Sequence, residues 1–281
     1  MIRNTDKPPW LTEMVAVWGY VQRNYFLTKR YFMWEVVWLV YVTINAMAIT
    51  YIGAGVGTAP GGGTVDTTFL MTYLLVGALL WNYLSMLFDV LSETVSWERW
   101  EGTIEYTFMS PSSRVTHLLG MGFYAVIYGI LQTAMTLGVC YLLLDLDLSD
   151  ANYWGALLVL SVASVSLVGF GVVAAVLPLL SPEKGQQVSY IVSSVLLLVS
   201  GVYYEVGVLP EWMQMIAMFS PVTYALEGSR AALQEGAGIG RLWESIWVLL
   251  VMGVVFVPLG IFIFHLGERY AKKTGKLKRS G

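Results

Sequence analysis

Six long runs of apolar residues constrain the fold of this chain more than any other feature of its sequence. A helix needs about 20 apolar residues to cross the hydrocarbon core of a bilayer. Hydrophobic residues make up 57% of the 281 residues and charged residues only 12%, whereas a soluble domain carries about a quarter charged residues. The sequence therefore predicts an all-α membrane protein whose six transmembrane helices lie at residues 31–52, 68–89, 115–144, 153–180, 188–204 and 243–266.

The distribution of lysine and arginine predicts how these spans are oriented. Connections between successive runs alternate between basic and acidic composition. With both termini inside the cell, 14 of the 16 Lys and Arg residues face the cytoplasm, which is the side where short loops collect positive charge. We therefore expect a multi-pass protein of the cell (inner or plasma) membrane with an N-in/C-in topology.

Two segments that are not simple spans flank the six-helix domain of residues 31–266. Residues 1–30 form a predicted cytoplasmic N-terminal region, in which Trp10, Met14, Trp18 and Tyr25 recur at helical spacing. This pattern is typical of an amphipathic helix that lies in the membrane interface. It fits either a simple anchor or an anchor that also contacts a partner. Residues 267–281 form a basic cytoplasmic tail.

The connection between the fifth and sixth runs, residues 205–233, contains an apolar stretch that is too short to cross the membrane. Pro210 and Pro221 flank this stretch at residues 213–219. We expect short helices that re-enter the outer leaflet, because irregular backbone at that depth must be covered by protein or water. An ordinary outer loop with one hydrophobic face is the alternative.

Uncharged polar residues are the only polar side chains near the middle of the predicted spans. An ionisable group at depth is costly and usually serves transport, so its absence argues against a proton relay. Asn45, Asn82 and Gln132 are candidate polar groups of a transport pathway. The alternative is that they form hydrogen bonds between helices, each worth about 1 kcal/mol or less.

Signatures of catalysis and of cofactor binding are missing from the sequence. It contains no G-x-x-x-x-G-K-[ST] nucleotide-binding loop, no H-E-x-x-H or G-x-S-x-G motif and no Cys/His ligand cluster. We therefore expect a chain that is not itself an enzyme and that holds no cofactor.

A dense polar island lies in the second inner connection, residues 91–114. Within it Glu98, Glu101 and Glu105 are spaced so that one helix would carry all three on one face. Gly102 permits close approach of backbones, and Pro111 ends the element. A rigid charged helix of this kind can dock a soluble partner, although a solvated loop helix with ordinary surface charges has the same pattern.

The island resembles a signature of ABC-2 type permeases, the membrane subunits of type V ABC exporters. Residues Glu98-Arg99-Trp100-Glu101-Gly102-Thr103-Ile104-Glu105 with Ser110-Pro111 match the pattern E-R-x-x-G-T-[LI]-E … [SA]-P. Residues 209–212, 220–224 and 227–230 look like the second signature of that family. Among its branches, the drug-resistance and daunorubicin-exporter-like branch is the most similar.

The resemblance implies that transport across the membrane and ATP hydrolysis are carried out by separate chains. The permease would pair with a second permease, identical or different, and two copies of an ATPase subunit that hold ATP and Mg²⁺ would dock from the cytoplasm. No nucleic-acid partner is expected. The implied coupling interface consists of Glu98, Arg99, Glu101, Gly102, Thr103, Glu105, Ser110 and Pro111. The implied outer re-entrant segment includes Pro210, Trp212, Pro221, Tyr224, Glu227 and Arg230.

The expected function is therefore export of a substrate through a dimeric permease that a separate ATPase drives. Two other functions fit the residues: a secondary transporter or channel that works without an ATPase, and a membrane scaffold that recruits a cytoplasmic protein through the polar island. The uncharged interior, rich in Trp and Met, fits amphipathic drugs or lipids, and polysaccharide export also remains open.

Overall fold

All regular structure in the described part of the chain is helical. The computed structural model describes residues 8–57, 66–102, 109, 113–144, 148–180 and 184–274. The elements are α1 (Pro9–Arg30), α2 (Phe32–Gly57), α3 (Thr67–Glu101), α5 (Arg114–Leu144), α6 (Tyr153–Ala174), α7 (Val176–Leu180), α8 (Gly185–Val199), the 3₁₀ turn η1 (Val206–Val208), α9 (Glu211–Ala217), α10 (Pro221–Gln234) and α11 (Ile239–Lys273).

Five segments of the described chain are long and apolar enough to cross a membrane. They are α2, α3, α5, α6 with α7, and α11. The sixth apolar run forms α8, which has 15 residues and a length of about 22 Å. This length is less than the roughly 30 Å of a hydrocarbon core. The helix ends at Val199, and Gly201 adopts a φ of 72° in the turn that follows. The six-span count therefore stays a prediction.

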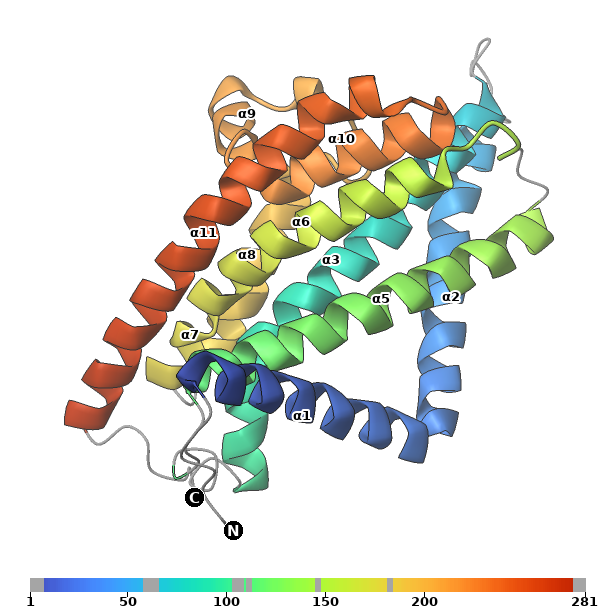
Figure 1. Ribbon diagram of the computed structural model, residues 1–281. Helices are drawn as coiled ribbons and strands as arrows, with labels where there is room; N and C mark the ends of the chain where they lie inside the picture. The colour runs from blue at the N-terminus through green and yellow to red at the C-terminus, as the bar shows by residue number, and fades with distance from the viewer. Residues whose placement is uncertain are drawn as a thin grey trace.

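The long helices run alongside one another, and α1 lies across one end of them (Figure 1). The start of α1, the end of α3, the start of α5 and the end of α11 all lie at this end. Helices α9 and α10 lie at the opposite end. Basic residues of α1, of the start of α5 and of the end of α11 therefore gather at the α1 end; they include Arg23, Lys29, Arg114, Arg269 and Lys272.

Helix α3 forms the centre of the bundle and α2 its periphery. Leu75, Leu87 and Leu91 of α3 are fully buried, since α3 contacts α2, α5, α6 and α10. By contrast, α2 exposes large apolar side chains such as Phe32 and Met33. These side chains match a hydrocarbon environment better than water, as expected for a helix at the lipid boundary.

Helices α6 and α11 make the most extensive contact in the fold, and glycine permits it. A Cβ atom on Gly169 would lie 2.6 Å from the backbone carbonyl carbon of Phe256 and from the nitrogen of Val257. A Cβ on Gly260 would lie 2.5 Å from the carbonyl oxygen of Gly169. The two backbones are therefore in direct contact, as small residues allow between membrane helices.

The helices that follow α8 are attached to the bundle by polar contacts. The Ser200 and Ser220 hydroxyls, which lie at the end of α8 and the start of α10, are 2.7 Å apart. Asn152, which caps α6, donates its backbone N–H to the carbonyl oxygen of Ala232 and its side-chain amide to that of Ala237, each at 2.8 Å. The connection between α5 and α6 is thereby joined to the end of α10.

Candidate functional site

The polar island begins as a direct extension of α3. This helix has 35 residues and continues to Glu101, well beyond the predicted span end at residue 89. Glu98, Arg99 and Glu101 therefore lie on the last turns of α3. Gly102 ends the helix with a φ of 72°, a conformation in which glycine is strongly preferred after a helix.

The expected helix face of Glu98, Glu101 and Glu105 can be followed only as far as Glu101. Helix α3 ends there, and Gly102 follows with a left-handed backbone. Thr103, Glu105, Ser110 and Pro111 lie outside the described residues. The described part of the predicted coupling segment is therefore the end of α3 together with Gly102.

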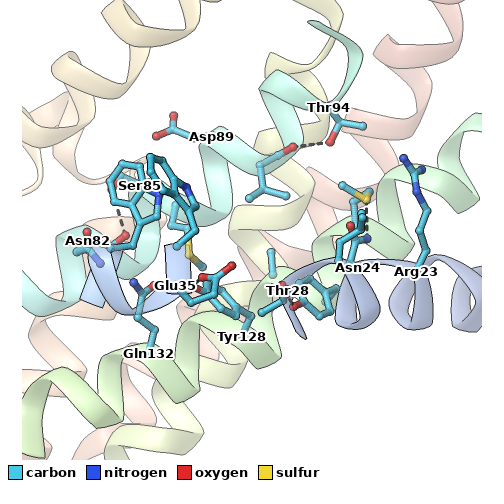
Figure 2. Close-up of a pocket in the computed structure, with 18 of the residues that line it drawn as sticks. Arg23, Asn24, Thr28, Glu35, Asn82, Ser85, Asp89, Thr94, Tyr128 and Gln132 are labelled. Carbon is cyan, nitrogen blue, oxygen red and sulfur yellow. Dashed lines mark hydrogen bonds between the residues drawn. The ribbon is translucent and has the colours of Figure 1, made fainter. Parts of the chain in front are cut away.

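A cavity of about 610 Å³ lies near the α1 end of the bundle, between α1, α2, α3 and α5. Figure 2 shows its polar lining. Asn82 of α3 and Gln132 of α5, two of the three candidate pathway residues, line this cavity. The third, Asn45, is not among the residues that line it. Its exposed amide donates to the carbonyl oxygen of Tyr41 on its own helix at 2.8 Å.

The cavity also contains charged residues that the sequence did not bring together. Glu35 of α2 and Asp89 of α3 both line it, and so does Arg23 of α1. Glu35 lies near the start of the first predicted span, residues 31–52, and Asp89 lies at the end of the second, residues 68–89, so both fall on the predicted inner side. The first two spans are consecutive and therefore antiparallel, so two residues at the same depth can face each other. That shared depth was the signal from which a common site could have been predicted.

Hydroxyl groups on one face of α5 hold the α1–α2 unit in place. Three α5 hydroxyls each donate a hydrogen bond to an oxygen of the N-terminal helices. These hydrogen bonds are partly buried, and a typical one contributes about 1 kcal/mol, and more where the acceptor is charged. The cavity therefore has a fixed wall along α5. The pairs are Thr116 with Glu13, Tyr124 with Thr28, and Tyr128 with Glu35.

Arg230 is the main polar contact of the outer segment. Its guanidinium donates to the carbonyl oxygens of Gly201 at 2.9 Å and Val202 at 2.5 Å, just after the end of α8. The guanidinium carbon also lies 3.6 Å from the ring centroid of Tyr73 on α3. Arg230 thus connects α10, the end of α8 and α3. Burial lowers the pKa of Arg230, but a guanidinium stays protonated.

The other predicted residues of the outer segment fall at the helix ends and on the surface. Pro210 precedes α9 and Pro221 begins α10, a position that proline favours because the first N–H groups of a helix have no partner. Tyr224 donates its hydroxyl to the carbonyl oxygen of Met218 at 3.2 Å, and Trp212 is exposed. Burial raises the pKa of Glu227, and Arg230 opposes this shift.

Replacing Arg230 with methionine is expected to detach the outer segment. The variant keeps an unbranched stem of similar shape but removes the guanidinium, which leaves two carbonyl oxygens without donors at a cost of about 2–3 kcal/mol. Thermal unfolding of the detergent-solubilised protein, followed by size-exclusion chromatography, measures the loss. Arg241→Met is the control, since Arg241 pairs with Glu235 on the surface and such pairs contribute about 0–1 kcal/mol. Equal effects of the two variants would contradict the assigned role of Arg230.

The all-helical fold of the described residues, with five helices long and apolar enough to cross a membrane, defines a multi-pass membrane protein. The family model for the ABC-2 type transporter matches residues 16–233, which is most of the chain and includes both signature regions. The chain therefore belongs to the ABC-2 type transporter family, and the resemblance found in the sequence is confirmed.

Two curated proteins are similar to this chain at low identity. The chain is 25% identical over 166 residues to the "Probable multidrug ABC transporter permease YbhR" of Escherichia coli (strain K12), covering 58% of this chain and 44% of that protein. It is 26% identical over 147 residues to the "Uncharacterized protein YhgE" of Bacillus subtilis (strain 168), covering 51% of this chain and 18% of that protein. The chain thus spans less than half the length of these relatives.

Proposed function

We propose that this chain is the membrane-spanning permease subunit of an ATP-driven exporter. Its membership in the ABC-2 type transporter family is the observation that carries the proposal. The sequence contains no nucleotide-binding loop, so ATP and Mg²⁺ would be held by two copies of a separate ATPase. The permease would act as a dimer with a second permease chain.

The end of α3 is the proposed contact for the ATPase. The helix runs from the centre of the bundle to Glu101, with the acidic residues Glu98 and Glu101 on its last turns, and the segment that follows Gly102 continues the interface to Pro111. A continuous helix transmits a displacement at its end directly to the packed core. Closure of the ATPase pair would therefore move α3 and, through it, α5, α6 and α10, which α3 contacts.

The proposed topology has six spans, with both termini in the cytoplasm of a cell membrane. The gathering of basic residues at the α1 end supports this orientation, because cytoplasmic loops are rich in Lys and Arg. In this orientation α1 lies in the inner interface, and α8 with its following turn is the short fifth span. Helices α9 and α10 re-enter the outer leaflet.

Co-purification and ATPase assays test the proposed function. The full chain would be co-expressed with a P-loop ATPase encoded by a neighbouring gene, extracted in mild detergent and reconstituted into liposomes. We expect a stable complex in which the permease changes the rate of ATP hydrolysis and ATP drives substrate movement. If the chain alone transports substrate along an ion gradient and binds no ATPase, the proposal is wrong.

One observation favours the ATPase-independent transporter as a second candidate. Glu35 and Asp89 both line a cavity that opens between helices, and carboxylates within membrane helices often serve ion coupling. Reconstituting the permease without any ATPase separates the two functions. Uptake that an ion gradient drives in such liposomes, and that Glu35→Gln abolishes, would support this second function.

A further inference from the structure

A second cavity lies at the end of the bundle that carries α9 and α10 (Figure 1), between α3, α10, α11 and the turn after α8. Its volume is about 470 Å³, within the roughly 300–1,000 Å³ that is typical of ligand sites. Arg230 lines it and fixes one wall through its bonds to the carbonyl oxygens of Gly201 and Val202. A Cβ atom on Gly77 of α3 would lie 2.1 Å from the Val202 oxygen, so α3 and this turn are in direct contact. The walls of the cavity are therefore fixed relative to one another.

Three buried donors at the floor of this cavity have no hydrogen-bond partner within the described residues. They are Thr223 Oγ1, Arg230 Nε and Gln234 Nε2. Thr223 is only 5% exposed, so its hydroxyl group is shielded from bulk water. Leaving a buried polar group unpaired costs folding free energy, and such groups are rare in native proteins. Because a hydroxyl, a guanidinium and an amide nitrogen can all donate, the floor suits a ligand group that carries acceptor oxygens.

Carboxylates surround the mouth of the cavity. Glu205, Glu227 and Glu244 line it, and all three reach the surface. A fourth lining carboxylate, that of Glu235, is paired with Arg241. Carboxylate oxygens accept strong hydrogen bonds from an ammonium group. The cavity thus has donors at its floor and negatively charged acceptors at its mouth, a polarity that matches a zwitterion with one anionic group and one ammonium group.

Exposed tryptophans indicate that this end of the bundle lies at the level of the lipid headgroups. Trp212 in the first turn of α9 is 60% exposed, and Trp243 near the start of α11 is 55% exposed. Tryptophan is enriched where the hydrocarbon meets the headgroups. Glu244 directly follows Trp243 and lines the cavity. Phe69 also lines it and is exposed, which provides an apolar surface beside the polar site.

We propose that this cavity binds the phosphoethanolamine headgroup of a phospholipid whose acyl chains stay in the bilayer beside Phe69. The phosphate oxygens accept hydrogen bonds from Thr223, Arg230 Nε and Gln234, and the ammonium group lies among the carboxylates of the mouth. A phosphate bound to Nε also holds Arg230 in the orientation that bonds to the turn after α8, so the lipid stabilises the outer segment. It is a resident ligand and not a transported substrate, and its binding does not depend on the proposed function.

A series of lipids that differ only in their headgroups tests the proposal. The full chain, delipidated in detergent, would be unfolded thermally with added dioleoyl-phosphatidylethanolamine, its N-methyl and N,N-dimethyl derivatives, or dioleoyl-phosphatidylcholine. We expect phosphatidylethanolamine to raise the unfolding temperature by about 3 °C or more. The shift should fall with each added methyl group, because each one replaces an N–H donor.

Two further ligands test the charge and the source of the headgroup. Dioleoyl-phosphatidylglycerol should give a smaller shift than phosphatidylethanolamine, because the carboxylates of the mouth repel a phosphate that has no ammonium beside it. Soluble glycerophosphoethanolamine at the same concentration should give no shift, because it lacks the acyl chains that hold the lipid beside the protein.

Thr223→Val separates a loss of binding from a loss of folding. Valine has nearly the shape of threonine but no hydroxyl group, so the variant without lipid should be at least as stable as the wild type. Its affinity for phosphatidylethanolamine, titrated through the shift in unfolding temperature, should nevertheless fall about tenfold. Glu227→Gln combined with Glu244→Gln should also weaken binding about tenfold. Glu211→Gln is the control and should leave affinity unchanged, since Glu211 is exposed at the start of α9 and is not part of the cavity's lining.

Equal shifts with phosphatidylcholine and phosphatidylethanolamine would overturn the proposal, and so would wild-type affinity in Thr223→Val. An equal shift with phosphatidylglycerol would assign the cavity to an anion at Arg230, and a full shift with glycerophosphoethanolamine would assign it to a soluble ligand. Either result excludes the lipid proposed here. Failure of the proposed function would instead show as absence of an ATPase complex, with these lipid effects intact.

Discussion

Replacing Gly102 with valine is expected to abolish the stimulation of ATP hydrolysis by the permease while leaving its membrane insertion intact. Gly102 has a φ of 72°, where an L-residue costs about 1–2 kcal/mol, and a β-branched side chain is especially unfavourable there. Valine therefore favours continuation of α3 beyond Glu101. The segment that would contact the ATPase then leaves the helix in another direction.

A matched variant separates the backbone effect from the loss of a small residue. Gly102→Asn should retain most of the stimulation, because asparagine tolerates the left-handed region. Stimulated ATPase activity and co-purification of the complex measure both variants. Glu98→Ala combined with Glu105→Ala is expected to lose stimulation as well, since it removes the charges that would pair with the ATPase. If Gly102→Val couples normally, the end of α3 is not the coupling site.

Replacing Gly169 with valine is expected to prevent stable packing of α6 against α11. Even the first carbon of a side chain would lie 2.6 Å from the α11 backbone, so the helices would have to separate. Overpacking of this kind costs typically 1–3 kcal/mol, and because the clashing atoms are backbone atoms of Phe256 and Val257, which cannot rotate away, we expect a cost of about 3 kcal/mol for valine. The folded fraction after detergent extraction, measured by size-exclusion chromatography, should fall sharply.

The control for this prediction is another glycine within a long helix, one whose Cβ position has free space around it. A Cβ atom on Gly138 of α5 meets nothing within 4 Å, so Gly138→Val should leave the folded fraction close to that of the wild type. Gly169→Ala should fall between the two, because alanine adds only the clashing Cβ. Equal yields of Gly169→Val and Gly138→Val would show that the α6–α11 contact tolerates separation.

The sequence predicted the positions of the long helices well but not where each one ends. The second span was expected to end near Asp89, where the hydropathy falls, yet α3 continues to Glu101. Hydropathy marks where lipid contact ends, whereas a helix ends only where the backbone is interrupted, here at Gly102. The fifth run shows the opposite case: its apolar residues extend to Tyr204, but the helix ends at Val199.

The candidate site could be predicted only in part, because its residues are far apart in the sequence. Asn82 and Gln132 were singled out as uncharged polar residues within spans, and both line the cavity. Arg230 was expected on the outer segment, but its contact with the end of α8 could not be read from sequence. The proximity of Glu35 to Tyr128 likewise depends on how α2 packs against α5.

The sequence by itself determined the class of this protein, the course of its long helices and its family. Each helix enters lipid on the strength of its own apolar side chains and its own hydrogen-bonded backbone. A membrane span can therefore be predicted from a local stretch of sequence. Only the tertiary structure decided that Glu35, Asp89 and Arg23 share one cavity. That arrangement depends on the rotation and depth of four helices, which are set by close contacts between residues distant in the chain.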